Sequence, residues 1–371
     1  MTTHLGQPPR DLRWYAHPGA RTWTCAPAPA DVQVFHAGLP GYAPTPLTEV
    51  PAIAAELGVG RAFVKDESAR MGLAAFKVLG ASWAVHRVLS GRPAADPVLL
   101  VTASDGNHGR AVARMARVLG QRAHVFVPSG VHPAAVAAIA AEGAHVTEID
   151  GTYDEAVHLA AQAASAPSAV LVQDTAWPGY EQVPGWIVEG YSTLFTEIDA
   201  QLGQAGAAGP GLVVVPAGVG SLAQAAVTHY RSRPDGGGPP GSAAALLCVE
   251  PDSAACVLAS LVKDELTSVP TGTTVMAGLN CGTPSLLSWP YLRGGLDAAV
   301  VVTDAGSVAA ARDLAACGIP AGPCGGASLA GARGALTGDG AAARRAALGL
   351  GPAATVVVLS TEGAAANPLP G

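Results

Sequence analysis

Short apolar runs that alternate with helical patterns dominate this chain of 371 residues. The apolar runs lie at residues 61–67, 98–101, 124–128, 145–149, 170–173, 212–216, 244–249, 299–302 and 355–359. Helical patterns separate them, among them 110–119, 133–142, 153–164 and 183–201. Strands that alternate with helices form βαβ units, in which the strands run parallel. The sequence therefore predicts an α/β fold built on parallel sheets, and its length allows two domains.

Four other segments carry weaker signals. Residues 1–45 are rich in proline and predict an irregular arm over the surface or across a partner subunit. Residues 46–57 predict a first short helix, and residues 233–241 predict a plain loop. The stretch 267–292 is loop-rich and polar for this chain, so we expect it to line a binding site.

Composition argues against several classes of function. A net charge of -7, with 21 Lys and Arg residues and no basic cluster, argues against a nucleic-acid partner. No run of ~18 strongly apolar residues occurs, so no membrane span or membrane partner is expected. Met1–Tyr15 lacks the apolar segment of a signal peptide, and the six cysteines lack the paired spacing of a zinc site. We therefore expect a cytoplasmic enzyme with reduced thiols and no metal site.

One lysine lies alone in an otherwise uncharged run. Lys77 occurs between Leu73 and Ser82, and an apolar helical pattern begins directly after it. Burial and the positive end of a helix both disfavour the ammonium form, which predicts a lowered pKa for Lys77. An unprotonated amine attacks aldehydes, as a Schiff base with pyridoxal phosphate requires. The structural alternative is a lysine whose stem lies along apolar surface at a helix start.

A glycine-rich turn joins the strand at 212–216 to a helix. It consists of Gly218, Val219, Gly220, Ser221 and Leu222. Glycines let backbone N–H groups approach an anion, which the positive helix end attracts. The anion could be the phosphate of pyridoxal phosphate. It could also be the pyrophosphate of a dinucleotide, as in an NAD-binding oxidoreductase, because the glycine spacing and Glu250 resemble that fingerprint. A tight turn without a ligand is the third alternative.

A loop of small and polar residues follows the strand at 98–101. It consists of Ser104, Asp105, Gly106, Asn107, His108 and Gly109. Successive N–H groups at the carboxyl end of a strand suit the α-carboxylate of an amino acid, and Asn107 can donate to a phenolate oxygen. The alternative is a turn that caps the helix from Arg110, but this alternative leaves Lys77 unexplained.

Four motifs, in this order, resemble those of the fold-type II pyridoxal-phosphate enzymes, the relatives of serine/threonine dehydratase, cysteine synthase and the tryptophan synthase β-chain. The motifs are Ala75-Phe76-Lys77, the loop 104–109, the turn 218–222 and Ser360-Thr361-Glu362-Gly363. The resemblance covers residues 40–371. It implies two parallel-sheet α/β domains with pyridoxal phosphate in the cleft between them, and a homodimer. The larger domain would comprise residues 1–80 and 190–371, and the smaller, inserted domain residues 81–189.

The same resemblance implies roles for the site residues. Lys77 would carry the cofactor as a Schiff base beside Phe76, Asn107 would contact the ring oxygen, and the turn 218–222 would hold the phosphate. Ser360 would hydrogen-bond the pyridine nitrogen, with the following threonine as a substitute. A hydroxyl partner leaves this nitrogen largely unprotonated, which suits elimination better than transamination.

Within the superfamily the sequence is most similar to the diaminopropionate ammonia-lyases. The closer match rests on residues 65–73, 174–181 and 276–282. Dehydratases carry serine at the position of Asp105, whose carboxylate would repel a substrate carboxylate unless the substrate brings a second cation. The β-ammonium of 2,3-diaminopropionate is such a cation. The resemblance implies elimination of D- or L-2,3-diaminopropionate to pyruvate and two ammonia, with a serine/threonine dehydratase as the alternative.

The resemblance also implies the catalytic groups. Lys77 would take the Cα proton of the L-enantiomer and Asp105 that of the D-enantiomer, while Asp174 would bind the substrate amine. The substrate site would comprise Ser104, Asp105, Gly106, Asn107, His108 and Asp174. A helix cap at Asp105 and a turn residue at Asp174 are the structural alternatives. Cys256 and Cys281 flank this region, either as a regulatory disulfide or as two buried thiols.

Overall fold

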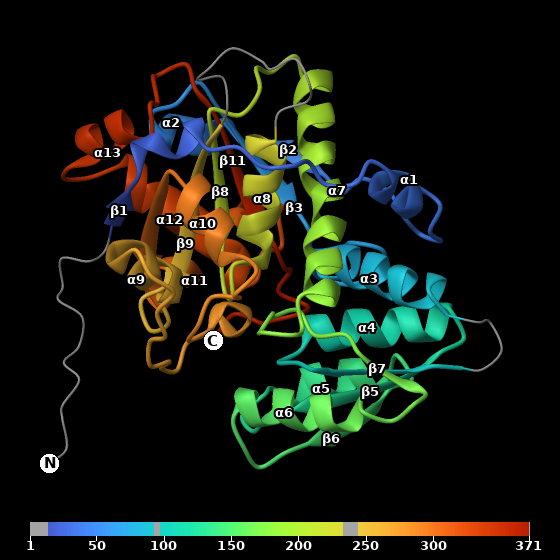
Figure 1. The fold of residues 1–371 in the computed structure, drawn as a ribbon. Helices are drawn as coiled ribbons and strands as arrows, with labels where there is room; N and C mark the ends of the chain where they lie inside the picture. The colour runs from blue at the N-terminus through green and yellow to red at the C-terminus, as the bar shows by residue number, and fades with distance from the viewer. Residues whose placement is uncertain (1–13, 93–96, 233–243, 371) are drawn as a thin grey trace, which may run out of the picture.

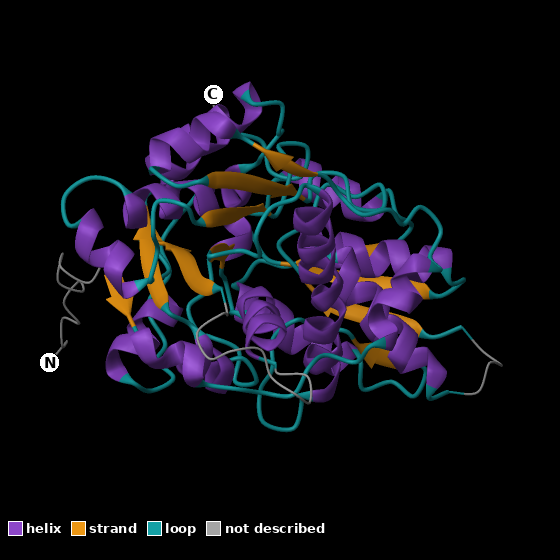
Figure 2. Ribbon diagram, turned by 90° about the horizontal axis from the view of Figure 1, so that it is seen from above, coloured by secondary structure: helices purple, strands orange, loops and turns teal. Residues whose placement is uncertain are grey.

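The computed structural model describes residues 14–92, 97–232 and 244–370, which are arranged around two sheets (Figure 1). The larger sheet has the strand order β1 (Trp14–Ala16), β10 (Ala298–Val302), β9 (Ala245–Pro251), β8 (Leu212–Pro216), β11 (Thr355–Ser360), β3 (Arg61–Asp66) and β2 (Leu47–Glu49). The smaller sheet has the order β6 (His145–Glu148), β5 (Arg122–Val127), β4 (Leu99–Ala103) and β7 (Ala169–Leu171). Viewed from above, the strands form two separate groups with helices between and around them (Figure 2).

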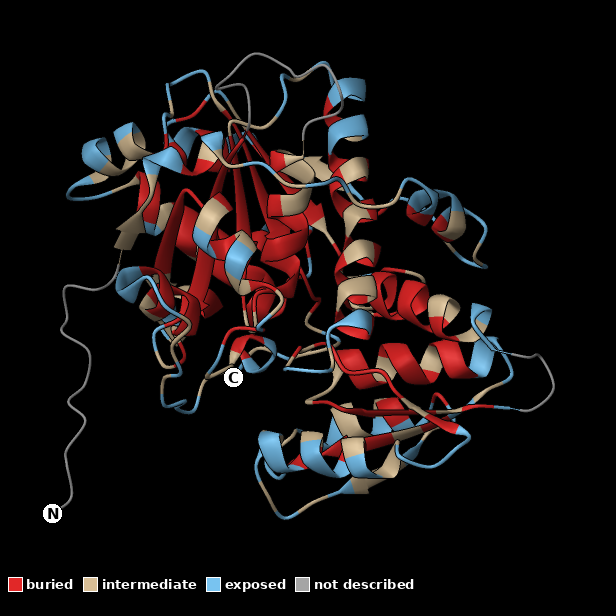
Figure 3. Ribbon diagram, in the orientation of Figure 1, coloured by how far each residue is buried: buried red, intermediate tan, exposed pale blue. Residues whose placement is uncertain are grey.

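The central strands of the larger sheet are parallel and buried on both faces. From β10 to β3 every neighbouring pair is parallel, and only the edge strands β1 and β2 pair antiparallel. Val213 and Val215 belong to the core formed with α7 (Gln182–Gln204) and α8 (Ser221–Arg231). Leu212 and Val214 point the other way, into the core formed with α11 (Asp304–Ala316) and α12 (Pro323–Leu336). Continuous apolar strands of this kind are typical of sheets covered by helices on both faces, as Figure 3 shows.

The smaller sheet is parallel throughout and has its own helices. α4 (Asn107–Val118) and α5 (Pro133–Ala140) contribute to the core on one face, and α6 (Tyr153–Ala163) covers the other. The strands of this sheet lie between residues 99 and 171, and those of the larger sheet lie outside this range. The domain boundaries at 80/81 and 189/190 stay a prediction.

Two glycines bring α3 (Val78–Ser90) into close contact with α7. A Cβ atom on Gly80 would lie 2.6 Å from Cε1 of Tyr191, and one on Gly190 would lie 2.5 Å from the carbonyl oxygen of Leu79. α7 runs beside the larger sheet, and α3 and α4 lie at its lower end (Figure 1). Because Lys77 directly precedes α3, this close packing fixes the backbone from which the lysine projects.

The N-terminal segment differs from the prediction. Residues 14–45 are not wholly irregular, because they form β1, a 3-10 turn η1 (Pro18–Thr22) and α1 (Asp31–Ala37). Residues 46–57 form strand β2 and then helix α2 (Pro51–Leu57), since Leu47 pairs with Lys65 of β3 and Pro51 is a favourable first residue for a helix. The start of the predicted arm and the predicted loop 233–241 lie outside the described residues.

Five further elements complete the described chain: α9 (Cys256–Lys263), η2 (Ala277–Leu279), α10 (Trp289–Gly295), α13 (Ala341–Ala347) and the long loop 264–276. The predicted loop-rich stretch 267–292 is loop apart from η2 and the start of α10. None of the helices described here has the length and apolar content needed to cross a membrane.

Candidate active site

The parallel strands bring the predicted motifs to the carboxyl ends of the two sheets. In the larger sheet, β3, β11 and β8 are neighbours, and the Lys77 loop, Ser360 and the turn 218–222 follow them or end them. In the smaller sheet, β4 and β7 are neighbours, and the loop 104–109 and Asp174 follow them. Ligands of open α/β sheets bind at such carboxyl ends, so the topology groups these motifs around one region.

Lys77 links the two groups of motifs. It is the N-cap residue of α3, and its Nζ donates to Oδ2 of Asp174 over 2.6 Å. The ammonium lies 5.6 Å from the ring centre of Phe76, and that ring contacts the ring of Tyr191 at a centroid distance of 4.8 Å. The predicted catalytic pair is therefore in direct contact, with aromatic side chains beside it.

The lowered pKa predicted for Lys77 is wrong. Burial does disfavour the ammonium, as the sequence argument held, but the carboxylate of Asp174 outweighs it and raises the pKa of Lys77. The sequence could not reveal this partner, because 97 residues separate Asp174 from Lys77. An ammonium is not a nucleophile, so attack by Lys77 on an aldehyde would require release of this ion pair.

Asp174 is a buried carboxylate that contacts two potential cations. Burial alone would raise its pKa, but Lys77 and then His108 lower it to about 2. His108 Nδ1 lies 3.9 Å from Oδ2 of Asp174 and has no hydrogen-bond partner within the described chain. The other ring nitrogen of His108, Nε2, bonds the carbonyl of Val172 over 2.7 Å, so Nε2 carries the proton. Burial lowers the pKa of His108, and the neutral ring directs the Nδ1 lone pair toward Asp174.

Asp105 is a second carboxylate in the same region. Burial, and then the charge of Asp174, raise its pKa to about 7, although Lys77 acts in the opposite direction. Its carboxylate accepts no hydrogen bond from any residue that the structure describes. A carboxylate with a pKa near neutrality and no fixed partner has the properties of a general base. The helix-cap alternative is not what the structure shows, because α4 has no side-chain cap.

The loop before α4 is built around the hydroxyl of Ser104. This oxygen accepts the N–H groups of Gly106 at 3.0 Å and Gly109 at 2.8 Å, so these two donors are used within the loop. Gly106 has a φ of 148°, which favours glycine. The N–H groups of Asn107 and His108 belong to the first turn of α4, where no intrahelical acceptor exists. These two N–H groups are therefore the donors of this loop that are left free to bind an anion.

The turn between β8 and α8 offers a larger group of free donors. Within the described chain, none of the backbone N–H groups from Gly218 to Ala223 donates to an acceptor. Gly220 has a φ of 96°, and a Cβ on Gly218 would lie 2.9 Å from Sγ of Cys281 and 3.0 Å from the carbonyl of Gly278. The hydroxyl of Ser221 donates to the carbonyl of Asp174 over 3.1 Å, which ties this turn to the smaller sheet. Consecutive free N–H groups at a helix N-terminus form an anion site.

Ser360 and Glu250 also lie near the carboxyl ends of strands, and they distinguish a pyridoxal-phosphate site from a dinucleotide site. The hydroxyl of Ser360 is fully buried and has no partner among the described residues, so it is ready to bond a ligand atom. Glu250 is buried too, but its two oxygens accept the N–H groups of Val257 and Leu258, each at 2.7 Å. Glu250 therefore caps α9 and does not face a ribose, which removes the support for a dinucleotide.

Known proteins match the chain over most of its length. The family model for pyridoxal-phosphate dependent enzymes matches residues 39–362. A diaminopropionate ammonia-lyase of Salmonella typhimurium is 39% identical over 285 residues, which cover 71% of this chain and 69% of the relative. The chain belongs to the pyridoxal-phosphate dependent enzymes and, within them, to the diaminopropionate ammonia-lyase family.

Structural similarity to this family extends over nearly the whole chain. The crystal structure of diaminopropionate ammonia-lyase from Escherichia coli, in complex with an aminoacrylate-PLP azomethine reaction intermediate, superposes with a TM-score of 0.84 at 32% identity. The match covers 95% of this chain and 94% of that chain. Maize serine racemase, at 22% identity and a TM-score of 0.75, shares the fold. The predicted fold-type II architecture is confirmed, and the protein is an ammonia-lyase with pyridoxal phosphate as its cofactor.

The residues present fit this cofactor. Lys77 would supply an amine for the aldehyde, the N–H groups of 218–223 would supply donors for the phosphate, and the unpartnered hydroxyl of Ser360 would meet the ring nitrogen. Asn107, predicted to contact the ring oxygen, donates through Nδ2 to Oε2 of Glu362 over 2.7 Å. The amide has a second N–H that remains available for a ligand.

Sequence reasoning missed three side chains in this region. Glu362 stood in a quoted motif without an assigned role, and only its burial reveals it. Tyr191 has a buried hydroxyl with no described partner, and burial raises its pKa, with Lys77 acting in the opposite direction and Asp174 in the same one. The hydroxyl of Tyr153 accepts a hydrogen bond from Gln173 over 2.7 Å beside Asp174. No local sequence signal marks either tyrosine, because both lie within ordinary helical patterns.

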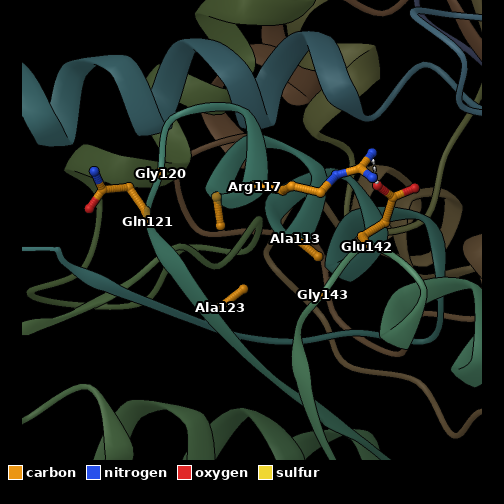
Figure 4. Close-up of a pocket in the computed structure, with 8 residues that line it drawn as sticks. Ala113, Arg117, Gly120, Gln121, Ala123, Glu142 and Gly143 are labelled. Carbon is orange, nitrogen blue, oxygen red and sulfur yellow. Dashed lines mark ion pairs between the residues drawn. The ribbon is translucent and has the colours of Figure 1, made fainter.

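The cysteines and one pocket of the smaller domain have no role in the chemistry described above. All six cysteines are free thiols in this structure, Cys256 and Cys281 included. The pocket in Figure 4 lies on the smaller lobe, has a volume of about 330 Å³ and contains none of the predicted site residues. Its polar lining is dominated by Glu142, which pairs with Arg114 at 2.6 Å and Arg117 at 2.8 Å.

Proposed function

We propose that this protein eliminates the β-amine of 2,3-diaminopropionate and releases pyruvate and two molecules of ammonia, with one water consumed. The observation that carries the proposal is the pair of carboxylates, Asp105 and Asp174, beside a single lysine cation. A site with surplus negative charge disfavours an ordinary amino acid and favours a substrate with a second ammonium. Membership of the diaminopropionate ammonia-lyase family supports the same substrate.

Asp174 is proposed to hold the substrate amine. Its Oδ2 accepts an ammonium N–H at 2.6 Å from Lys77, so its position and low pKa already suit a bound cation. A lysine that is bonded to the cofactor no longer offers a free ammonium, and Asp174 then needs another cation. The β-ammonium of the substrate supplies it, and His108 Nδ1 lies close enough to accept or share a proton there.

Lys77 and Asp105 are proposed to remove the Cα proton. Bound pyridoxal phosphate withdraws electrons from Cα and makes this proton acidic. Asp105, with a pKa raised to about 7, exists partly as the free carboxylate at neutral pH and can accept the proton of the D-enantiomer. Lys77 serves the L-enantiomer. The N–H groups of Asn107 and His108 are proposed to bind the substrate carboxylate, with Ser104 and Gly106 shaping that loop.

The substrate is tested by measuring ammonia and pyruvate released from D- and L-2,3-diaminopropionate and from D- and L-serine. We expect both products from diaminopropionate, in a ratio of two ammonia to one pyruvate. Asp174→Asn should lower kcat/KM for diaminopropionate by about 100-fold, the value of a hydrogen bond to a charged group, and affect serine much less. Asp150→Asn, an exposed carboxylate on the smaller lobe, is the control and should change neither.

Two results would contradict the proposal. The first is faster pyruvate release from serine than from diaminopropionate by the unaltered enzyme, which would favour the dehydratase alternative. The second is an equal loss with both substrates in Asp174→Asn, which would show that Asp174 does not recognise the β-amine.

The predicted homodimer and cytoplasmic location belong to the same proposal. The homodimer is supported by the resemblance to fold-type II enzymes, and the cytoplasmic location by six cysteines that are free thiols. Light scattering of the purified holoenzyme should give twice the chain mass of 36.8 kDa.

A further inference from the structure

Glu362 is a buried carboxylate that the proposed reaction does not use. It is 3% exposed and follows Ser360 by two residues at the end of β11. No lysine, arginine or histidine in the described ranges forms an ion pair with it. Taking a carboxylate out of water without a cation is costly, so its retention beside the cofactor site calls for a function.

Hydrogen bonds alone hold this charge. Oε2 accepts Nδ2 of Asn107 at 2.7 Å, and Oε1 accepts Nδ2 of Asn367 at 3.1 Å and the backbone N–H of Cys324 at 3.3 Å. Cys324 lies in the first turn of α12, whose positive end favours a carboxylate. The group is therefore held as an acceptor by three donors from three separate segments.

The backbone of Glu362 is fixed against the loop that carries Lys77. Glu362 forms a bridge with Ala75, and Gly363 donates to the carbonyl of Ala74 at 2.9 Å. On its other side, Gly322 donates to the carbonyl of Glu362 at 2.9 Å. The carboxylate therefore has a defined position relative to Lys77.

The contact with Asn107 determines which end of that amide faces Glu362. A carboxylate is only an acceptor, so it bonds the NH₂ group and repels the amide oxygen. A flip of the Asn107 amide would place Oδ1 against Glu362 and is therefore disfavoured. With one N–H used by Glu362, the direction of the second N–H is fixed as well.

We propose that Glu362 is a positioning residue that orients the amide of Asn107, so that its second N–H is presented to the ring oxygen of the cofactor. This inference rests on the proposed function only for the contact between Asn107 and the cofactor. Glu362 and Asn107 come from opposite sheets, so the contact also sets the position of α4 relative to β11 across the site.

The test measures cofactor binding, not turnover. Pyridoxal phosphate is titrated into the cofactor-free protein while the visible absorption band is recorded, for the unaltered chain and for Glu362→Gln, Asn107→Ala and the double variant. Glutamine has the same shape but can donate to Oδ1 of Asn107, so it permits the flip. We expect Glu362→Gln to weaken cofactor binding about tenfold and to shift the band as Asn107→Ala does.

The double variant decides whether Glu362 acts through Asn107. If it does, Glu362→Gln adds less than about twofold in the Asn107→Ala background. Losses that multiply, or a Glu362→Gln protein with the unaltered affinity and band, would overturn the inference. Asn367→Ala removes another donor to the same carboxylate and serves as the control, with no expected band shift.

A merely structural contact between the sheets predicts a different result. The reversed pair Asn107→Asp with Glu362→Gln keeps an amide–carboxylate hydrogen bond but loses the N–H for the ring oxygen. We expect it to bind the cofactor as weakly as Asn107→Ala, and an affinity restored to that of the unaltered chain would contradict us. If Glu362→Gln does not fold, Glu362→Asp retains a group that only accepts and should keep the original band, whereas the Asn107→Ala band would refute the inference.

These outcomes are separable from those of the proposed function. Cofactor affinity and band position do not depend on which amino acid the enzyme turns over. A preference for serine would overturn the substrate proposal and leave this inference in place. If the enzyme turns over diaminopropionate normally and Glu362→Gln does not change the band, the substrate proposal stands and the inference about Glu362 fails.

Discussion

Two groups of charged side chains lie along the loop that follows β3, and they differ in their balance of positive and negative charge. The Arg70 cluster consists of Lys65, Glu67, Arg70 and Glu197, two cations and two carboxylates. The Lys77 cluster consists of Lys77, Asp105 and Asp174, one cation and two carboxylates, with His108 beside them. One cluster is neutral and the other carries surplus negative charge.

The Arg70 cluster is fully hydrogen-bonded. Arg70 donates to both oxygens of Glu67, at 2.8 and 2.6 Å, and to both oxygens of Glu197, at 2.7 Å each. Lys65 donates to Glu197 at 2.6 Å, and Thr45 donates to Glu67 at 2.6 Å. Each charge has the partners that make a buried ion pair tolerable. This cluster fixes the start of the Lys77 loop against α7.

The Lys77 cluster leaves groups without partners. Asp105 accepts no hydrogen bond within the described ranges, and Nδ1 of His108 and the hydroxyls of Tyr191 and Ser360 are also unpartnered there. A buried polar group without a partner is uncommon and calls for an explanation, and three such atoms occur together here. We infer that the Arg70 cluster stabilises the fold and that the Lys77 cluster is completed by the cofactor and substrate.

The largest effect on activity should follow from removal of Lys77, the cation of the Lys77 cluster. Lys77→Ala should lower kcat by about 10³-fold or more, because it removes the group that is proposed to bind the cofactor covalently and to act as one of the bases. The visible absorption band of the holoenzyme should be lost, while circular dichroism shows a folded protein. A Lys77→Ala protein that keeps the band after borohydride treatment would contradict the assignment.

Removal of Arg70 from the Arg70 cluster should lower the free energy of unfolding. Arg70→Met keeps most of the side-chain volume but leaves Glu67 and Glu197 buried with only Lys65 as a cation. Breaking a buried pair in this way costs about 3–5 kcal/mol, which a urea titration would measure. Arg61→Met breaks the exposed pair with Glu49 and should change the unfolding midpoint little. Equal changes in the free energy of unfolding for the two variants would show that the Arg70 cluster stabilises the fold no more than an exposed ion pair does.

Much of this arrangement could be predicted from the sequence, because it is encoded locally. The strands β3 to β11 are short apolar runs, and the turn 218–222 and the loop 104–109 are contiguous motifs at their ends. Parallel topology then brings these motifs to the same edge without knowledge of any distance. The sequence predicts a helix where β2 lies, because three residues carry little pattern and pairing with β3 decides their conformation.

The interactions between distant residues could not be predicted. The raised pKa of Lys77 depends on Asp174, and the Arg70 cluster depends on Glu197, which lies 127 residues from Arg70. Glu362 and Asn107 are separated by 255 residues. A motif shows which residue types are present, but the charge balance around them follows only from tertiary packing.

The smallest expected effect comes from a variant that distinguishes the two proposed bases of the Lys77 cluster, Lys77 and Asp105. Asp105→Asn should lower kcat/KM for D-2,3-diaminopropionate by about 10²-fold and leave the L-enantiomer nearly unchanged, since Lys77 remains. The pKa of Asp105 is raised to about 7, first by burial and then by Asp174, and only the deprotonated carboxylate accepts a proton. Turnover of the D-enantiomer should therefore rise with pH through about 7, and this rise should be absent from the residual activity of Asp105→Asn. The L-enantiomer serves as the internal control in the same samples. Equal losses for the two enantiomers would mean that Asp105 affects only the charge of the site and accepts no proton. The Lys77 cluster would then contain one base instead of two.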